Sequence, residues 1–366
     1  AAAFLLGSVP AARAASVCPP PQVSAACAAL IDGRTGQTLY EKDADRRALI
    51  ASTTKIMTGL LVCEAGETDR RVTVPAAAVG LEGSSMYLKR GETLTRRDLL
   101  YGMMLHSGND AALTLAISVS GSEQAFVRQM NLRAQALGLR QTHFANPHGL
   151  DSGENYSSAR DLAALTQAAL QNQQFRTVVG TKTIACAGRT LTNHNKLLWR
   201  YDGCIGVKTG YTKAAGRILV SSATRDGLTL IAVVLGSPSS ADRFHSATTL
   251  LDYGFANYAA APLPTLPERP LALAVKGSAE DSVPLDYAAL PETILIEKGT
   301  ASALRAELTL PEALEAPVEK GQTVGKVSIF QDDTLLNEYE VKAAADAPLL
   351  TFGGALELLW QCLLGA

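Results

Sequence analysis

The chain has 366 residues, and its 33 Lys and Arg against 35 Asp and Glu leave a formal net charge of -2. This balance excludes the strongly basic surface that binding to a polyanion would need, so we predict no nucleic acid partner. Hydrophobic residues make up 47% of the chain, and the length exceeds what one ordinary domain needs. Both properties predict a globular protein with a sizeable core.

The first residues resemble the end of a secretory signal peptide. Residues 1–10 are largely apolar, and Ala12-Arg13-Ala14 has the small residues of a cleavage site. We expect a signal-peptide remnant over 1–14 and an exported mature chain that begins near Ala15. A disordered Ala-rich terminus is the alternative.

Six cysteines are scattered along the chain without a C-x-x-C spacing or a His-rich cluster, so the sequence predicts no metal site. An exported chain can form disulfides, and Cys186 with Cys204 is the easiest pair to envisage, but the sequence leaves the pairing open. Cys63 is expected in the core.

A serine and a lysine stand three residues apart at the start of a predicted helix. A hairpin is expected over 25–41, and from Ile56 to Cys63 the apolar residues recur with helical spacing, which puts Ser52 at or just before the first turn. The helix dipole there favours negative charge developing at an attacked carbonyl. The Lys55 amine, with its pKa lowered by burial and nearby cations, can take the serine proton. The alternative is a capping serine beside a solvated lysine, because a Ser-x-x-Lys pattern occurs about once by chance in such a chain.

Two further short motifs follow in order. Thr95 is predicted to cap a helix with Asp98 as its capping-box partner, and this helix ends at Ser107-Gly108-Asn109, before another helix over 111–119. Alone, such a turn more often only connects two helices than takes part in catalysis. Lys208-Thr209-Gly210 ends a short β-rich run.

The remaining pattern predicts an α+β domain in which an antiparallel sheet is flanked by a helical cluster. The expected elements are short strands at 72–74 and 86–88, a polar loop over 146–155, a helix through Leu170, a hairpin at 183–192, buried strands at 218–223 and 228–235, and a closing helix over 241–253.

Beyond this domain we predict a linker over 261–270, a small all-β, sandwich-like domain over 271–345, and an amphipathic helix over 348–366. One face of that helix carries Leu349, Phe352, Leu356, Leu359, Trp360 and Leu363, and the opposite face carries Gly354, Glu357 and Gln361. Its length and its mid-segment Glu favour a helix that lies in the membrane interface over one that crosses the bilayer. Docking on the β domain is the alternative.

In this order the three motifs resemble those of the penicillin-recognising serine enzymes. Finer features resemble the low-molecular-mass penicillin-binding proteins of the D-alanyl-D-alanine carboxypeptidase family, namely Asn146-Pro147-His148-Gly149-Leu150, the run from Gly206 to Thr212, and Asp242-Arg243-Phe244. The resemblance covers residues 23–258 in detail. It implies a β-lactamase/transpeptidase-like fold, a carboxypeptidase domain over 15–260, and no cofactor.

The resemblance implies catalytic roles for four residues. Ser52 attacks the carbonyl of the penultimate D-alanine of a peptidoglycan stem peptide, and Lys55 accepts its proton. Ser107 relays a proton toward the leaving D-alanine, and Asn109 orients Lys55 and the substrate amide. Water then hydrolyses the acyl-enzyme, whereas penicillin leaves slowly.

Five further residues are implied in substrate binding. Lys208 keeps the site electropositive, and Thr209 and Arg243 bind the terminal carboxylate. Gly210 leaves room along the strand edge. The backbone N–H of Tyr211 joins that of the reactive serine in the oxyanion hole.

The resemblance also names partners and a location. The partners are a stem peptide ending in D-Ala-D-Ala, β-lactams, and a membrane surface through the C-terminal helix, on the outer face of the cytoplasmic membrane. The chain departs from some members at His194, where they carry Arg, and at Tyr211, where a His is common. For His194 we expect a surface or hydrogen-bonded structural role.

Three rival functions are considered. A class A β-lactamase needs a Glu in the loop after Ser-x-Asn, but Glu123 is too close along the chain and Glu154 lacks the expected neighbours. An endopeptidase acting on D-Ala cross-links would use the same catalytic residues. The intact motifs argue against a non-catalytic binder.

Overall fold

The computed structural model describes residues 18–266, 268–298 and 304–364. The chain divides into two compact units, the first ending at Asn257 and the second starting at Tyr258. The predicted signal-peptide remnant over 1–14 lies outside the described residues.

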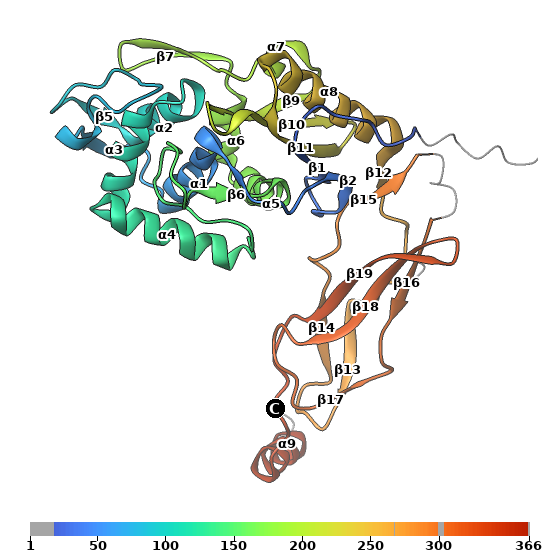
Figure 1. The fold of residues 1–366 in the computed structure, drawn as a ribbon. Coiled ribbons are helices and arrows are strands. Elements are labelled where there is room, and N and C mark those ends of the chain that lie inside the picture. Colours follow the sequence, from blue (N-terminus) through green and yellow to red (C-terminus); the bar gives the residue numbers. More distant parts are fainter. Residues whose placement is uncertain (1–17, 267, 299–303, 365–366) are drawn as a thin grey trace, which may run out of the picture. The chain divides into compact units, whose positions relative to one another are not determined.

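The first unit contains a five-stranded antiparallel sheet (Figure 1). In spatial order its strands are β2 (Thr38–Lys42), β1 (Cys27–Asp32), β11 (Leu228–Ser237), β10 (Gly216–Arg225) and β9 (Cys204–Thr212). Strands β10 and β11 form the predicted hairpin. Asp226 and Gly227 at its tip have φ angles of 47° and 79°, as a type I′ turn requires.

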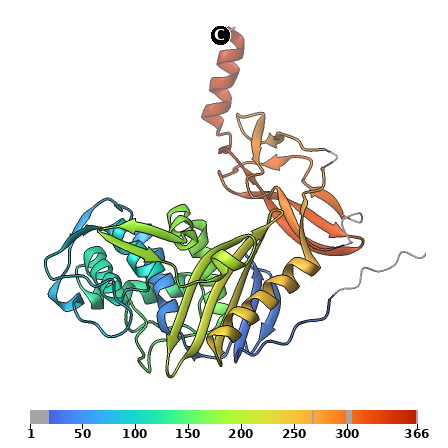
Figure 2. The ribbon, with the colours of Figure 1, turned by 90° about the horizontal axis from the view of Figure 1, so that it is seen from above.

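Helices cover both faces of this sheet. The helices of the first unit are η1 (Ala51–Thr54), α1 (Lys55–Ala65), η2 (Ala76–Ala78), α2 (Arg96–Leu105), α3 (Asn109–Ser120), α4 (Glu123–Ala136), α5 (Ala159–Gln171), α6 (Gln173–Gly180), α7 (Leu197–Arg200) and α8 (Ser240–Asn257). Helix α8 packs on β10 and β11 from one side, and α5 packs on β1 and β11 from the other (Figures 1 and 2). With both faces covered, all six residues of β1 are buried.

The predicted α+β architecture is confirmed, and so is the predicted capping box at Thr95. Thr95 Oγ1 accepts a 3.0 Å hydrogen bond from the Asp98 N–H, and the Asp98 carboxylate accepts one from the Thr95 N–H, which completes the predicted capping box at the start of α2. This box fixes where α2 begins, and α2 ends one residue before His106.

In the described part of the first unit, three two-stranded sheets lie outside the main sheet. They are β3 (Ala48–Leu49) with β6 (Tyr156–Ser157), β4 (Arg71–Thr73) with β5 (Thr93–Thr95), and β7 (Thr183–Cys186) with β8 (Arg189–Thr192).

One expectation for the first unit is wrong. The segment 86–88 is not a strand, because its backbone N–H groups donate to the Asp110 carboxylate and its carbonyls accept from Arg189 instead of from a neighbouring strand. Cys186 and Cys204 do not form a disulfide, and both are free thiols.

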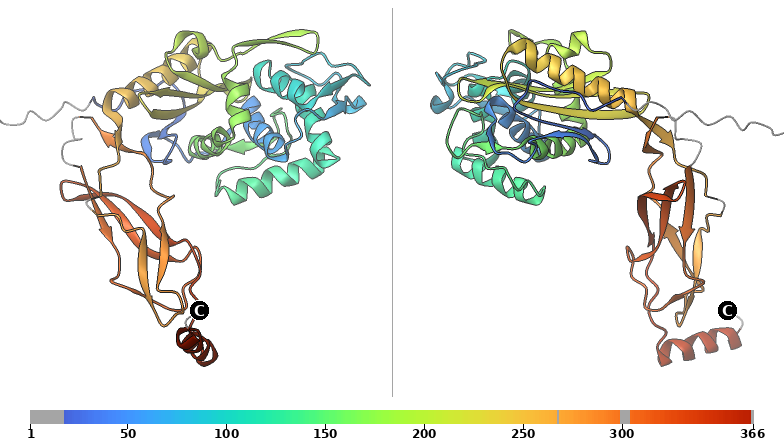
Figure 3. Two further views of the ribbon diagram at one scale, coloured as in Figure 1. Left: turned by 180° about the vertical axis from the view of Figure 1, so that it is seen from behind. Right: turned by 45° about the vertical axis from the view of Figure 1, so that its right-hand side comes forward.

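The second unit is rich in β structure (Figure 3). Strand β12 (Tyr258–Pro262) pairs with β15 (Thr293–Glu297), and a six-stranded sheet has the order β16 (Leu304–Thr309), β18 (Thr323–Gln331), β19 (Thr334–Ala343), β14 (Ser282–Asp286), β13 (Ala272–Lys276) and β17 (Leu314–Glu315). Residues 261 and 262, predicted as the start of a linker, therefore belong to a strand.

The second unit ends in helix α9 (Phe352–Leu364). The six large apolar side chains predicted on one face are exposed, with fractions from 58 to 87%. The side chains of Glu357 and Gln361, predicted on the opposite face, lie outside the described part of the chain. Among the described residues no helix combines the length and hydropathy needed to traverse a bilayer.

Candidate active site

The predicted nucleophile lies in the short turn η1 that leads into α1. Ala51, Thr53 and Thr54 of this turn are buried, whereas Ser52 is half-buried and lines a cavity of about 490 Å³. Thr53 donates to the Ile50 carbonyl through both its N–H and its hydroxyl. The turn is therefore fixed from its buried side and presents the Ser52 hydroxyl to the cavity.

Lys55, the first residue of α1, is fully buried beside this serine. Its Nζ lies 3.1 Å from Ser52 Oγ and 2.6 Å from Asn109 Oδ1, and it also contacts the backbone oxygen of His148. Burial, and secondarily the charge of Lys208, lower the pKa of Lys55 well below its usual value. A neutral amine has two hydrogens for the two carbonyl oxygens, which leaves its lone pair for the serine hydroxyl.

Ser107 and Asn109 lie at the junction between α2 and α3. Ser107 is buried at the cavity wall and has a φ of 62°, a left-handed conformation that is uncommon for a residue with a side chain. The Asn109 amide uses both ends, because its oxygen accepts from Lys55 and its nitrogen donates to the Glu82 carbonyl at 2.6 Å. The turn thus joins the reactive lysine to the segment over 82–88.

Asp110 holds that segment in place. Its Oδ1 accepts from the N–H groups of Met86 and Ala111, and its Oδ2 accepts from the Ser85 hydroxyl and the Leu88 N–H, at 2.7 to 3.0 Å. The carboxylate is buried. Sequence reasoning assigned no role to this residue, although it directly follows the Ser-x-Asn motif.

Strand β9 forms another wall of the cavity. Thr209, Gly210 and Tyr211 line it, whereas Lys208 is buried and donates to the Thr209 carbonyl at 3.0 Å. Burial and the nearby Arg243 lower the pKa of Lys208 to about 7. The Arg217 guanidinium lies 3.5 Å from the Tyr211 ring centre and holds this exposed ring by a cation–π contact.

Gly210 has a steric role that the sequence did not suggest. A Cβ at this position would lie 3.2 Å from the Ile50 carbonyl oxygen and 3.4 Å from the Ala51 Cβ. The glycine therefore lets β9 approach the turn that carries Ser52, in addition to leaving the strand edge open.

The cavity is rich in cations. Arg243, in the first turn of α8, donates through Nη1 to the carbonyls of Gly210 and Ile218, and its Nε is buried with no partner among the described residues. Burial and the charge of Arg217 lower its pKa to about 10. Arg217 and Lys196 also line the cavity, and no Asp or Glu does among the described residues. This wall is suited to an anion.

The loop over 146–150 contributes backbone atoms to the site. The Asn146 side chain accepts from the N–H groups of His148 and Gly149, and this turn points the His148 carbonyl at Lys55. Gly149 has a φ of 86°, and a Cβ there would lie 2.0 Å from the Ala51 carbonyl oxygen. Polar residues around a glycine predict a tight turn from the sequence. They do not predict which side chain a backbone carbonyl of that turn will contact.

His194, expected in a surface or structural role, lines the active-site cavity and is exposed to it. Its ring lies 5.2 Å from that of His106, centre to centre. The structure therefore brings six predicted residues to the cavity wall, namely Ser52, Ser107, Thr209, Gly210, Tyr211 and Arg243. It keeps Lys55, Asn109 and Lys208 buried.

Comparisons with known proteins identify relatives of the chain. Residues 13–239 match the family model described as D-alanyl-D-alanine carboxypeptidase, and residues 271–348 match the C-terminal domain of penicillin-binding protein 5. The chain is 35% identical over 339 residues to the D-alanyl-D-alanine carboxypeptidase DacF of Bacillus subtilis, which covers 89% of this chain and 87% of the relative.

Two solved structures are similar to the chain. Penicillin-binding protein 5 from Haemophilus influenzae has a TM-score of 0.79 and 33% identity, covering 90% of this chain and 99% of the other. The Streptomyces K15 DD-transpeptidase has a TM-score of 0.63 and 39% identity, covering 65% of this chain and 100% of the other. The chain therefore belongs to the D-alanyl-D-alanine carboxypeptidases, serine peptidases of the penicillin-binding type.

Proposed function

We propose that the chain performs the family's reaction on Ser52, with Lys55 as the base, and removes the terminal D-alanine from peptidoglycan stem peptides. The observation that carries this assignment is the 3.1 Å separation of Lys55 Nζ and Ser52 Oγ, with the other two contacts of the amine going to carbonyl oxygens. A base in this position can take the hydroxyl proton as the oxygen attacks.

Acylation forms one bond and breaks another. Ser52 Oγ attacks the carbonyl carbon of the penultimate D-alanine, and its proton passes to Lys55. The backbone N–H groups of Ser52 and Tyr211 would hold the resulting oxyanion. Ser107 then relays the proton to the nitrogen of the terminal D-alanine as the C–N bond breaks, and water later hydrolyses the ester. β-Lactams acylate the same oxygen.

Recognition of the terminal carboxylate falls to the cationic wall. The Arg243 guanidinium and the Thr209 hydroxyl lie on it, and the absence of Asp or Glu from the lining of the described cavity leaves the charge of Arg243 for the substrate. That lining also lacks the Glu on which deacylation in a class A β-lactamase depends. A carboxypeptidase needs this free carboxylate, whereas an endopeptidase does not.

The experiment exposes the full chain to penicillin and to a D-Ala-D-Ala peptide. We expect a mass adduct on Ser52 and release of D-alanine, and Ser52→Ala should lose both. Amidation of the substrate carboxylate should slow the wild-type enzyme much more than Arg243→Ala. Faster cleavage of a D-Ala cross-link than of the free terminus would favour the endopeptidase, and neither adduct nor release would contradict the proposal.

We further propose that α9 lies in a membrane interface on the outer side of the cytoplasmic membrane. Its exposed apolar residues, among them Phe352 and Trp360, support this. An enzyme that acts on peptidoglycan at that surface must be exported. The full chain should float with anionic vesicles, and Phe352→Ser with Trp360→Ser should remain in the soluble fraction. Equal flotation of both proteins would refute the anchor.

A further inference from the structure

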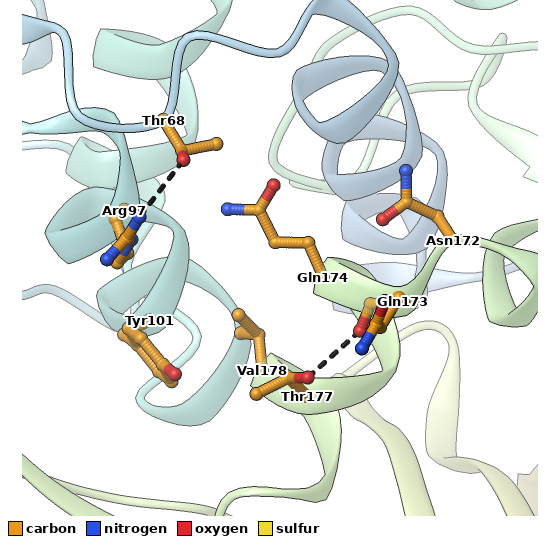
Figure 4. A pocket seen from close by; sticks show the side chains of 8 residues that line it. All are labelled: Thr68, Arg97, Tyr101, Asn172, Gln173, Gln174, Thr177 and Val178. Atoms are coloured by element: carbon orange, nitrogen blue, oxygen red, sulfur yellow. Dashed lines mark hydrogen bonds between the residues drawn. The ribbon is translucent and has the colours of Figure 1, made fainter.

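A second cavity, of about 600 Å³, lies between α2 and α6 in the first unit (Figure 4). No residue that lines it also lines the active-site cavity. Arg97 lies on its wall in the first turn of α2, and Ser107 follows the other end of the same helix. Ten residues at the helical rise put these positions about 15 Å apart, so the two cavities are separate.

The charge in this second cavity is already satisfied. Arg97 forms an ion pair with Asp69 at 2.9 Å, and its guanidinium also reaches the Thr68 hydroxyl. The other lining residues are uncharged. A phosphate or carboxylate ligand would therefore find no unpaired cation here, in contrast to the cationic wall around Arg243.

Polar groups that do remain available point into the cavity. Figure 4 shows Gln174 and Val178 reaching from α6 toward Arg97 and Tyr101 on α2. The structure gives the Gln174 amide and the Tyr101 hydroxyl no hydrogen-bond partner among the described residues, although both side chains are half-buried. Both polar groups are accessible to water, which a ligand can replace.

The lining chemistry selects a class of ligand. A side-chain amide presents a donor and an acceptor side by side, which matches neighbouring hydroxyls or an acetamido group. The half-buried Tyr101 ring offers an apolar surface for the C–H face of a sugar or for an acetyl methyl. We infer that this second cavity binds a neutral, N-acetylated amino-sugar chain.

The choice of polymer rests on the proposed function, because stem peptides are attached to a glycan of N-acetylated amino sugars. A cavity that holds the glycan, with Arg97 on its wall about 15 Å along α2 from Ser107 of the active site, would keep the enzyme on the polymer between turnovers and raise the effective concentration of stem peptides.

The test titrates the full chain with a tetramer of N-acetylglucosamine, which carries no stem peptide, and follows binding by calorimetry. We expect saturable binding that excess penicillin does not change. Gln174→Ala and Tyr101→Phe should each weaken it by about tenfold, equivalent to about 1.4 kcal/mol. Gln135→Ala, an exposed amide on α4 that lines neither cavity, is the matched control and should bind like the wild type.

Three results would overturn the inference: no saturable binding, competition by penicillin, or unchanged affinity in both cavity variants. Because Tyr101→Phe removes only a hydroxyl, loss of folding does not obscure its effect. D-Alanine release from a small soluble peptide should be the same in all of these variants. This second measurement separates a failure of the glycan site from a failure of the proposed catalytic function.

Discussion

The fully buried Lys55 Nζ lies 3.1 Å from Ser52 Oγ, and its other two contacts among the described residues are carbonyl oxygens. Lys55→Arg keeps a long basic side chain but cannot act as a proton acceptor, because guanidinium stays charged. We expect acylation by penicillin to slow by about 10²- to 10⁴-fold, measured as the rate of adduct formation. Lys213→Arg, on an exposed turn, should acylate at the wild-type rate. An active Lys55→Arg enzyme would refute the assignment.

The charge of Lys208 should tune the pH dependence of acylation. This charge lowers the pKa of Lys55, although burial is the larger cause. Lys208→Met removes the charge and should raise the pKa of Lys55, so a higher pH is needed to free the amine. We expect the acidic limb of the acylation profile, recorded from pH 5 to 9, to move to higher pH. A limb that stays in place or moves to lower pH would show that Lys208 acts otherwise.

Burial of Lys208 should also make the free energy of unfolding depend on pH. The pKa of Lys208 is about 7 in the folded chain, against 10.5 for a free lysine. Above pH 7 the unfolded chain therefore binds the extra proton, and the free energy of unfolding rises with pH, by at most about 1.4 kcal/mol per unit for one proton. Urea unfolding at pH 7 and 9 should show a steeper rise for the wild type than for Lys208→Met. Equal slopes would argue that Lys208 is charged in the fold.

Two glycines of one loop should respond differently to substitution by alanine, because only one of them has close neighbours. Gly149→Ala puts a methyl group 2.0 Å from the Ala51 oxygen at a positive φ, so the loop must move and carry the His148 carbonyl away from Lys55. We expect a loss of more than about 2 kcal/mol in unfolding free energy and of most acylation. Gly153→Ala meets nothing within 4 Å and should behave like the wild type in both assays.

Asp110→Asn should release the segment that it holds. Each carboxylate oxygen accepts from at least one N–H, so the amide NH₂ must face a donor in either orientation. We expect a loss of about 2 to 3 kcal/mol in unfolding free energy. Hydrogen exchange at Met86 and Leu88 should accelerate.

Asp69→Asn, in an exposed ion pair with Arg97, is the control for Asp110→Asn and should change stability by less than about 1 kcal/mol. Equal losses in the two variants would show that burial of the Asp110 carboxylate adds nothing.

Local patterns predicted much of the first unit. Apolar spacing located the helix after Ser52, the capping box located the start of α2, and Asp226-Gly227 located the hairpin of β10 and β11. Each of these features depends on residues close in sequence. The pairing of β1 with β11 does not, since it joins the two ends of the unit and leaves no local signal.

Backbone contacts account for what was missed at the site. The His148 group that contacts Lys55 is a backbone carbonyl. Every residue type has one, so no sequence pattern could identify this contact. The segment 86–88 reads as a strand by composition, but the Asp110 carboxylate takes its N–H groups. Cys186 and Cys204 are free although an exported chain can form disulfides, because residue type alone does not fix which thiols meet.

Among the described residues β9 pairs with no strand except β10, so its other side is a sheet edge, although side chains bind some of its carbonyls, as Arg243 binds that of Gly210. Such a border usually invites another molecule to stack on and start a fibril. Here the serine turn comes so close to Gly210 that even a methyl group there would lie 3.2 Å from a carbonyl oxygen. The serine turn therefore covers one face of β9 at Gly210, and this bulk beside the edge limits how closely a second folded copy could pair with the strand.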